Sequence, residues 1–316
     1  MSTFVATRLL PLFACLSAAC ATSPPAPAAP TEAALTNEPV PNAASVPVPK
    51  AADTWPTPRA CADKTCFAFD DDASALRALL AKTKPSTIGF GEAHTPAGFT
   101  ARTTVRRFTD DLLPVLAPET SALFVELLAA TSGCDGAKQA VKKEADAITT
   151  GQAEDNQNEY AQLGKRAREF GIVPDILRAS CDDLKSIQAA GELGVVTMME
   201  TIARLTGAAV VERRTRLSPG RPLVLAYGGA LHNDAMPRVG RETWSYGPRL
   251  TEATEGGYLE IDLVLHPLVT DSAAWQSFGW YAALGTLDSA APKAWLIENG
   301  ASSYAFVLAP EAAPSK

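Results

Sequence analysis

Short apolar runs recur along the chain after about residue 60, and most of them end at glycine or at a polar side chain. Runs of this length that are rich in β-branched and aromatic residues are typical of strands buried in a sheet. We expect seven such strands: STIGFGEAH (86–94), SALFVELL (121–128), GIVPDILRAS (171–180, interrupted by Pro174), RPLVLAYGG (221–229), YLEIDLVL (258–265), KAWLIE (293–298) and SYAFVLA (303–309).

Segments with helical spacing of apolar residues lie between these runs. The pattern predicts helices over 71–83, 97–116, 156–170 and 195–214. Alternation of strands and helices favours an α/β fold, here a single domain over residues 59–309 with a mainly parallel sheet flanked by helices. Ligands of such sheets bind at the carboxyl ends of the strands, so we expect a site there.

The first 20 residues have the layout of a secretory signal, with Arg8 followed by an apolar stretch and small residues before Cys20. They resemble a lipoprotein signal with lipid attachment at Cys20. The alternatives are lipid attachment at Cys15, ordinary secretion without a lipid, and an uncleaved membrane anchor. Residues 21–58 are rich in Pro and Ala and are expected to form a disordered tether, and 310–316 a disordered tail. We therefore expect a bacterial cell-envelope protein that is lipid-anchored to a membrane.

The formal net charge of −7, with no long basic run, argues against nucleic acid as a partner and leaves a small-molecule ligand as the expectation. Four cysteines remain beyond the signal, which fits disulfides in an oxidising compartment. Proximity in sequence favours Cys61–Cys66, which leaves Cys134–Cys181. A zinc site built from all four thiolates is the alternative, although the spacing lacks paired C-x2-C motifs.

Two of the three histidines follow strand-like runs in the same way. Gly91-Glu92-Ala93-His94 and Gly229-Ala230-Leu231-His232 both read G-x-x-H, and a glutamate, Glu126, interrupts the run FVELL. Since adjacent strand ends converge at one edge of a parallel sheet, two imidazoles and two carboxylates can meet there. Glu92, His94, Glu126 and His232 are thus the candidate catalytic residues. His94, His232 and Glu126 are candidate ligands of a divalent metal.

Structural roles compete with these assignments. Each histidine could simply hydrogen-bond a carbonyl at a strand end, and Glu126 could pair with Arg102, Arg106 or Arg107. His266 has no motif around it and is interpreted as a surface residue. Tyr227, Trp244 and Tyr246 could line a site or belong to the core. The chain contains no G-x-S-x-G, P-loop, H-E-x-x-H or G-x-G-x-x-G motif, which excludes the functions that these motifs mark.

TIGFGEAHTP, Glu126 in LFVELL and VLAYGGALHND together resemble the superfamily that joins erythromycin esterases, ChaN-type haem-binding lipoproteins and Tiki/TraB proteins. The resemblance covers roughly residues 85–265. Esterases of the group typically show G-E-x-x-H, one residue longer than Gly91-Glu92-Ala93-His94, and this difference favours the ChaN and Tiki/TraB branches. The ChaN branch usually continues with further polar residues, where Thr95-Pro96 follows here.

The resemblance implies a ChaN-like envelope lipoprotein that binds haem or a metal-containing ligand through His94 and His232, with Tyr227 nearby and Glu92 and Glu126 orienting the imidazoles. The alternative is a hydrolase of ester or peptide bonds that uses the same residues, either with a divalent metal or by activating water directly. A third possibility is a family member whose site no longer acts and which serves as a binding or structural protein.

Overall fold

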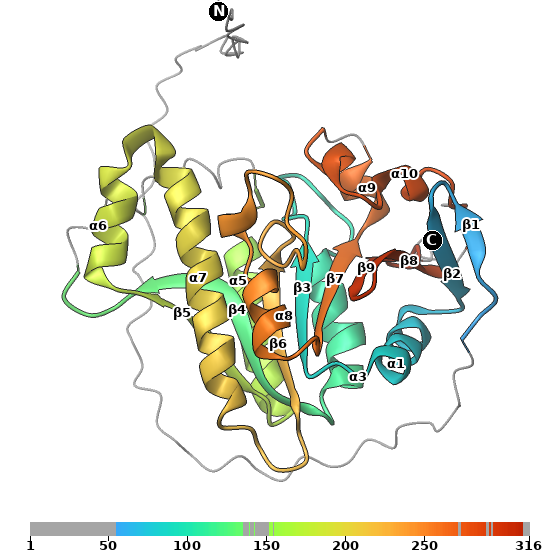
Figure 1. Cartoon of the computed structure of the whole chain (residues 1–316), viewed down its shortest axis with the longest axis horizontal. Coiled ribbons are helices and arrows are strands. Elements are labelled where there is room, and N and C mark those ends of the chain that lie inside the picture. Colours follow the sequence, from blue (N-terminus) through green and yellow to red (C-terminus); the bar gives the residue numbers. More distant parts are fainter. Residues whose placement is uncertain are drawn as a thin grey trace, which may run out of the picture. The chain divides into compact units, whose positions relative to one another are not determined.

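A nine-stranded sheet with helices on both faces forms the centre of the fold (Figure 1). The computed structural model describes residues 55–134, 139, 142, 152–153, 155–270, 273–288, 291 and 293–311. The expected signal with Cys20, residues 21–54 of the tether and residues 312–316 of the tail lie outside the described residues.

The strands are ordered β1-β2-β8-β9-β7-β3-β6-β4-β5, and those from β9 to β5 are parallel. The expected α/β domain with a mainly parallel sheet is therefore confirmed. The strands span Arg59–Cys61 (β1), Lys64–Phe69 (β2), Thr87–Glu92 (β3), Thr120–Ala130 (β4), Val173–Ala179 (β5), Leu223–Gly229 (β6), Tyr258–Val264 (β7), Ala294–Gly300 (β8) and Ser303–Val307 (β9).

Two groups of helices cover the faces of the sheet (Figure 1). On one face lie α1 (Asp72–Thr83), the consecutive turns α2 (Thr104–Arg107), η1 (Phe108–Leu112) and α3 (Leu113–Leu116), and α5 (Asn156–Glu169). The other face packs against α7 (Gly194–Arg214) and α8 (Gly247–Ala253). Shorter elements complete the fold: α6 (Cys181–Ala189), η2 (Gly191–Leu193), η3 (Glu242–Trp244), α9 (His266–Val269), η4 (Trp275–Ser277) and α10 (Tyr281–Leu284).

The helix expected over 97–116 is shorter and less regular than its apolar pattern indicates. It begins at Thr104, because the Thr103 side chain accepts a hydrogen bond from the Arg106 amide and caps the first turn. The preceding Gly98 has a φ of 81°. A π-helical turn at Phe108–Leu112 then interrupts the α-helix just before Pro114.

The edges of the sheet explain two further differences. Pro174 lies in β5, which is an edge strand, and an edge tolerates a residue without an amide proton. At the opposite edge β1, β2 and β8 are antiparallel, and β8 and β9 form a hairpin.

Within the part of the chain that the structure describes, one helical segment, Gly191–Arg214, is long and apolar enough to cross a membrane. It also packs on β4, β5 and β6 as a core helix would.

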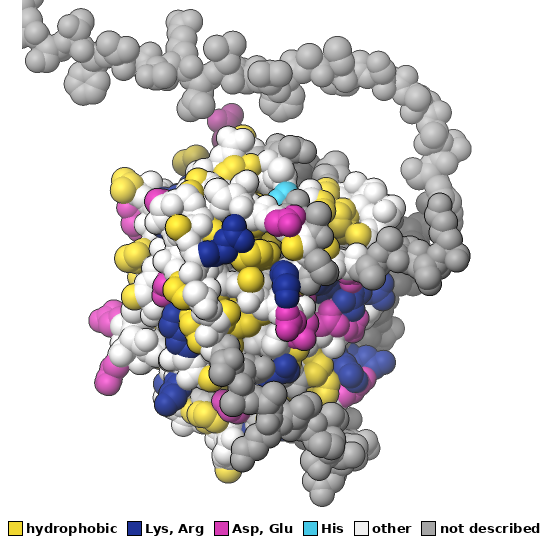
Figure 2. All heavy atoms as spheres, turned by 90° about the vertical axis from the view of Figure 1, so that its right-hand side faces the viewer, with side chains coloured by type: hydrophobic (Ala, Val, Ile, Leu, Met, Phe, Trp, Pro, Cys, Tyr) yellow, Lys and Arg dark blue, Asp and Glu magenta, His cyan; other side chains and the backbone are white. Residues whose placement is uncertain are grey.

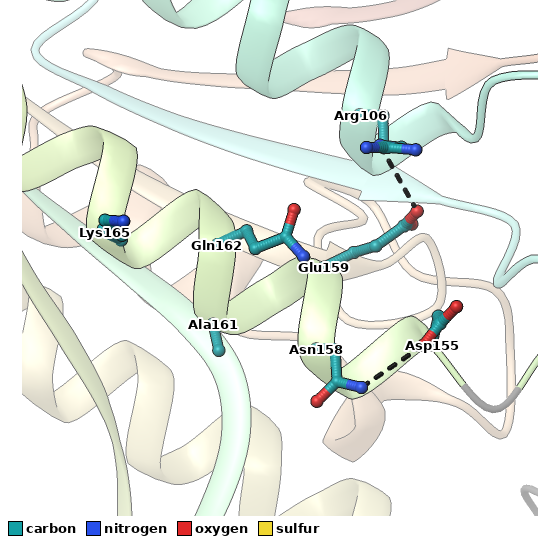
Figure 3. Close-up of a pocket in the computed structure, with 7 residues that line it drawn as sticks. All are labelled: Arg106, Asp155, Asn158, Glu159, Ala161, Gln162 and Lys165. Atoms are coloured by element: carbon teal, nitrogen blue, oxygen red, sulfur yellow. Dashed lines mark hydrogen bonds and ion pairs between the residues drawn. The ribbon is translucent and has the colours of Figure 1, made fainter.

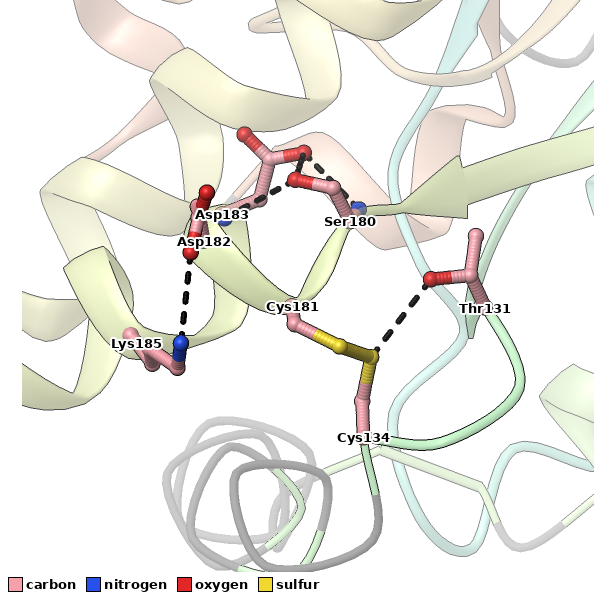
Figure 4. Close-up of a disulfide and its surroundings, with 7 residues drawn as sticks. All are labelled: Thr131, Cys134, Ser180, Cys181, Asp182, Asp183 and Lys185. Carbon is pink, nitrogen blue, oxygen red and sulfur yellow. Dashed lines mark hydrogen bonds and ion pairs between the residues drawn. A yellow bond between two sulfur atoms is a disulfide. The ribbon is translucent and has the colours of Figure 1, made fainter.

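Both cysteine pairs expected from sequence proximity form disulfides, Cys61–Cys66 and Cys134–Cys181. The second connects the chain after β4 to the first residue of α6, so it joins the carboxyl ends of two neighbouring strands (Figure 4). Ser180 caps α6 and forms a reciprocal capping box with Asp183. Asp182 and Asp183 thus lie in the first turn of the helix.

Candidate functional site

The two G-x-x-H segments leave directly adjacent strands at the same level of the sheet. Gly91 pairs with Gly228, and Glu92 with Gly229, in the parallel ladder of β3 and β6. The Ala230 amide then donates to the Glu92 carbonyl at 3.1 Å. A Cβ at Gly91 would lie 2.6 Å from the Asn233 side-chain oxygen, so this close approach requires glycine. The strand ends predicted to converge are thus in contact.

Glu92 is buried, with 3% of its surface exposed, and both of its oxygens accept hydrogen bonds from phenols. Tyr160 on α5 donates to Oε1 at 2.7 Å, and Tyr227 on β6 donates to Oε2 at 2.7 Å. Burial raises the pKa values of both tyrosines, and the nearby Glu92 charge raises them further, so the hydroxyls keep their protons. The two tyrosines satisfy a carboxylate that would otherwise be costly to bury.

His94 contacts this carboxylate through one ring nitrogen. Its Nδ1 lies 3.1 Å from Tyr160 Oη and 3.5 Å from Glu92 Oε1, and 31% of its side chain is exposed. Burial opposes a charge on the ring, but the interactions with Glu92 and with the Glu126 charge outweigh it and raise the pKa of His94. His94 is therefore held more readily as an imidazolium than a free histidine.

Glu126 sits at an irregularity of β4. The pairing of β4 with β5 shifts between Val125 and Leu128, so Glu126 stands outside the regular ladder. Its Oε2 accepts the Gly229 amide hydrogen at 2.6 Å. A Cβ at Gly228 would lie 2.1 Å from the same oxygen, and one at Gly229 would lie 3.1 Å from His94 Nε2. Glycines at the end of β6 thus leave room for both side chains.

The arginines that could have neutralised Glu126 pair with other carboxylates. Arg102 contacts Asp111 and Glu311, Arg106 lies 3.8 Å from Glu159, and Arg107 binds Asp72. Glu126 lies beside a histidine instead. His232 Nε2 lies 3.5 Å from Glu126 Oε1.

The orientation of His232 is fixed by the backbone. Its Nδ1 lies 2.8 Å from the Trp244 carbonyl oxygen, which can only accept a hydrogen bond, so Nδ1 carries a proton. Nε2 is therefore the ring nitrogen that faces Glu126. The Tyr246 amide donates to the His232 carbonyl at 2.9 Å and ties the loop to α8. The His232 side chain is only 7% exposed.

The other aromatic residues and the third histidine make contacts that stabilise the fold. Tyr246 is buried and its ring packs at 6.3 Å from that of Tyr258, while Trp244 lies under the Arg241 guanidinium. His266 begins α9, where its Nδ1 contacts the Thr270 hydroxyl. Tyr227, expected near a cofactor, has its hydroxyl bound to Glu92.

Tyr160 was not predicted as a site residue, because it lies on an otherwise polar helix far along the chain. The segment NQNEYAQLG gives an aromatic residue on the buried face of a helix, and such a residue usually serves packing. The neighbouring Glu159 helps to line a hollow of about 480 Å³ (Figure 3). Its lining residues are Arg106, Asp155, Asn158, Glu159, Ala161, Gln162 and Lys165.

Whether a metal ion fits the site depends on how its donor groups are spaced. Among the described residues, no group of three or more His, Cys, Asp or Glu side chains is spaced to hold a metal ion. His94, Glu126 and His232 are therefore near one another without forming a ready-made metal site.

Comparison with known proteins returns no match: neither a protein-family model, nor a curated protein, nor a solved structure matches this chain.

Proposed function

We propose that the chain is an exported hydrolase that activates water by acid–base catalysis to cleave an ester or peptide bond of a small molecule. The observation that carries this proposal is the different environment of the two imidazoles. His232 has Nδ1 committed to the Trp244 carbonyl, which leaves Nε2 beside Glu126 for proton transfer. His94 instead has Nδ1 beside Tyr160 and Glu92, and the carboxylates around it raise the pKa of its ring. Pairs of titratable groups in such contrasting environments divide into a base and an acid.

The chemistry follows from this division. His232 Nε2 removes a proton from water as the water oxygen bonds to the carbonyl carbon of the substrate, and the Glu126 carboxylate beside it stabilises the resulting imidazolium. The bond to the leaving group then breaks, and the leaving group takes a proton from His94. Glu92 and its two tyrosines hold His94 from the other side. Proton exchange with solvent restores both rings.

A small substrate agrees with the distribution of charge. On the face shown in Figure 2, Lys and Arg side chains lie next to Asp and Glu side chains and form no broad field of one sign. Together with the net charge of −7, this pattern gives no support to a polyanionic partner.

The test is hydrolysis by the purified protein of chromogenic esters and peptides that span short and medium acyl chains. We expect His232→Ala and His94→Ala each to lower kcat/KM by about 10²-fold or more, because each removes a proton-transfer group. His266→Ala is the matched control and should retain activity, since this histidine contacts Thr270. Activity should persist in chelator. Turnover that survives His232→Ala would refute the assignment.

A second candidate is binding of haem or a metal-containing ligand, as the resemblance to ChaN-type lipoproteins implies. One observation favours it: His94 is 31% exposed at the side chain, and its Nδ1 already has a partner, which leaves Nε2 for an external ligand. Haemin titration distinguishes the two functions. A Soret shift that disappears in His94→Ala would support haem binding, whereas a shift that persists in that variant would exclude His94 as the ligand.

A further inference from the structure

Tyr160 is the one phenol that contacts both Glu92 and His94 among the described residues. Its hydroxyl lies 2.7 Å from Glu92 Oε1 and 3.1 Å from His94 Nδ1. The ring is buried and packs edge-on to Tyr227 at 5.8 Å, so it has little freedom to move. It approaches the strand ends from α5, which packs on β4 and β5.

The hydrogens of this cluster can be assigned by counting donors. A phenol has one proton, and a carboxylate can only accept. Tyr227 gives its proton to Glu92 Oε2 and Tyr160 gives its own to Oε1. The contact between Tyr160 Oη and His94 Nδ1 is a hydrogen bond only if His94 is the donor. His94 must therefore carry a proton on Nδ1, and Nε2 becomes the atom whose protonation varies.

We propose that Tyr160 is a positioning residue, which accepts a hydrogen bond from His94 Nδ1 and fixes the place of the ring so that Nε2 faces the end of β6. A Cβ on Gly229 would lie 3.1 Å from that nitrogen and 3.7 Å from Glu126 Oε2, so both atoms border the same space. Without the phenol, His94 Nδ1 could approach Glu92 Oε1, now 3.5 Å away, and the ring would withdraw from Glu126. The catalytic consequence of this inference rests on the proposed function, whereas the tautomer assignment does not.

Nitrogen NMR of the protein labelled with ¹⁵N-histidine tests the tautomer directly. The chain has three histidines, so few signals must be resolved, and His94→Ala identifies the signal of interest. At a pH high enough to neutralise the ring, we expect His94 to carry its proton on Nδ1. A neutral His94 with the proton on Nε2 would overturn the proposal, even if no hydrolytic substrate is found.

Tyr160→Phe and Tyr227→Phe form a matched pair of variants. Each removes one hydrogen bond to Glu92, but only Tyr160→Phe removes the contact with His94. We expect Tyr160→Phe to lower kcat roughly 10- to 100-fold more than Tyr227→Phe, with similar KM values, as for other groups that orient an imidazole. It should also change the His94 ¹⁵N shifts, while Tyr227→Phe leaves them near those of the wild type. Equal losses of kcat and equal shifts would show that Tyr160 acts only through Glu92.

Discussion

Gly228 is where a single added carbon should affect the site most. A Cβ there would lie 2.1 Å from Glu126 Oε2 and 2.8 Å from Glu126 Cβ. We expect Gly228→Ala to push Glu126 off the Gly229 amide and away from His232, and to lower kcat/KM roughly 10²-fold, the usual effect of a displacement of about 1 Å. Steady-state kinetics on the best ester or peptide substrate measures this loss.

Gly164→Ala provides the control for that substitution. Gly164 lies inside α5, and its added Cβ would meet only the Pro174 side chain, at 3.8 Å. Alanine should stabilise the helix by up to about 1 kcal/mol and leave activity unchanged. If Gly228→Ala were as active as Gly164→Ala, Glu126 would have no role that depends on its present position.

Residue chemistry decided how much of the site could be predicted. His94 and His232 are two of only three histidines, and each follows a glycine and an apolar run, so their proximity could be inferred. Glu126 was noticed because it interrupts such a run. Tyr160 carries no comparable signal, because its role depends on how α5 packs across the sheet, and residue spacing within one segment does not encode that packing.

At the scale of the element, β7 carries two buried acids on one face of the strand, Glu260 and Asp262. Burial raises the pKa of Glu260 to about 7 and that of Asp262 well above its usual value. Glu260 accepts from the Ala235 amide at 2.5 Å and from the Ser303 hydroxyl at 2.7 Å. The strand thus holds protons that the unfolded chain would release.

Stability should therefore fall as the pH rises. Between the ordinary pKa of Glu260 and about 7, the folded state binds more protons than the unfolded state, so the free energy of unfolding decreases with pH. At low pH, Glu260 contributes on the order of 3 kcal/mol to the free energy of unfolding. This contribution is lost above pH 7. Denaturant titrations of Glu260→Gln should show a weaker decline than wild type between pH 5 and 8, while the exposed Glu252→Gln should follow wild type. An unaltered decline in Glu260→Gln would contradict this account.

Prediction of the elements was limited by local capping and by the position of each strand in the sheet. The central parallel strands could be predicted because they are buried on both faces and read as continuous apolar runs. The first two strands were not expected, since β1 has only three residues and Arg59 and Ala60 are exposed. The helix boundary at Thr104 depended on the Thr103 cap, which the apolar spacing of 97–116 does not reveal.

For the whole molecule, the two disulfides should contribute unequally to stability. Cys134–Cys181 spans a sequence separation of 47, against 5 for Cys61–Cys66. The entropy lost by the unfolded chain grows with the length of the closed loop, which gives about 4 kcal/mol for the longer loop and about 2 kcal/mol for the shorter one. Paired Cys→Ser variants, compared by denaturant unfolding, should therefore rank Cys134/Cys181 as the more destabilised.

The longer disulfide should also affect the site more strongly. It joins the carboxyl ends of β4 and β5 beyond Glu126, whereas Cys61–Cys66 joins β1 to β2 at the far edge of the sheet. Loss of Cys134–Cys181 should loosen the end of β4, so kcat/KM should fall even under conditions where the variant remains folded. Cys61/Cys66→Ser should keep the activity of the wild type at the same temperature. Equal activity of the two variants would mean that the irregular end of β4 holds Glu126 without the disulfide.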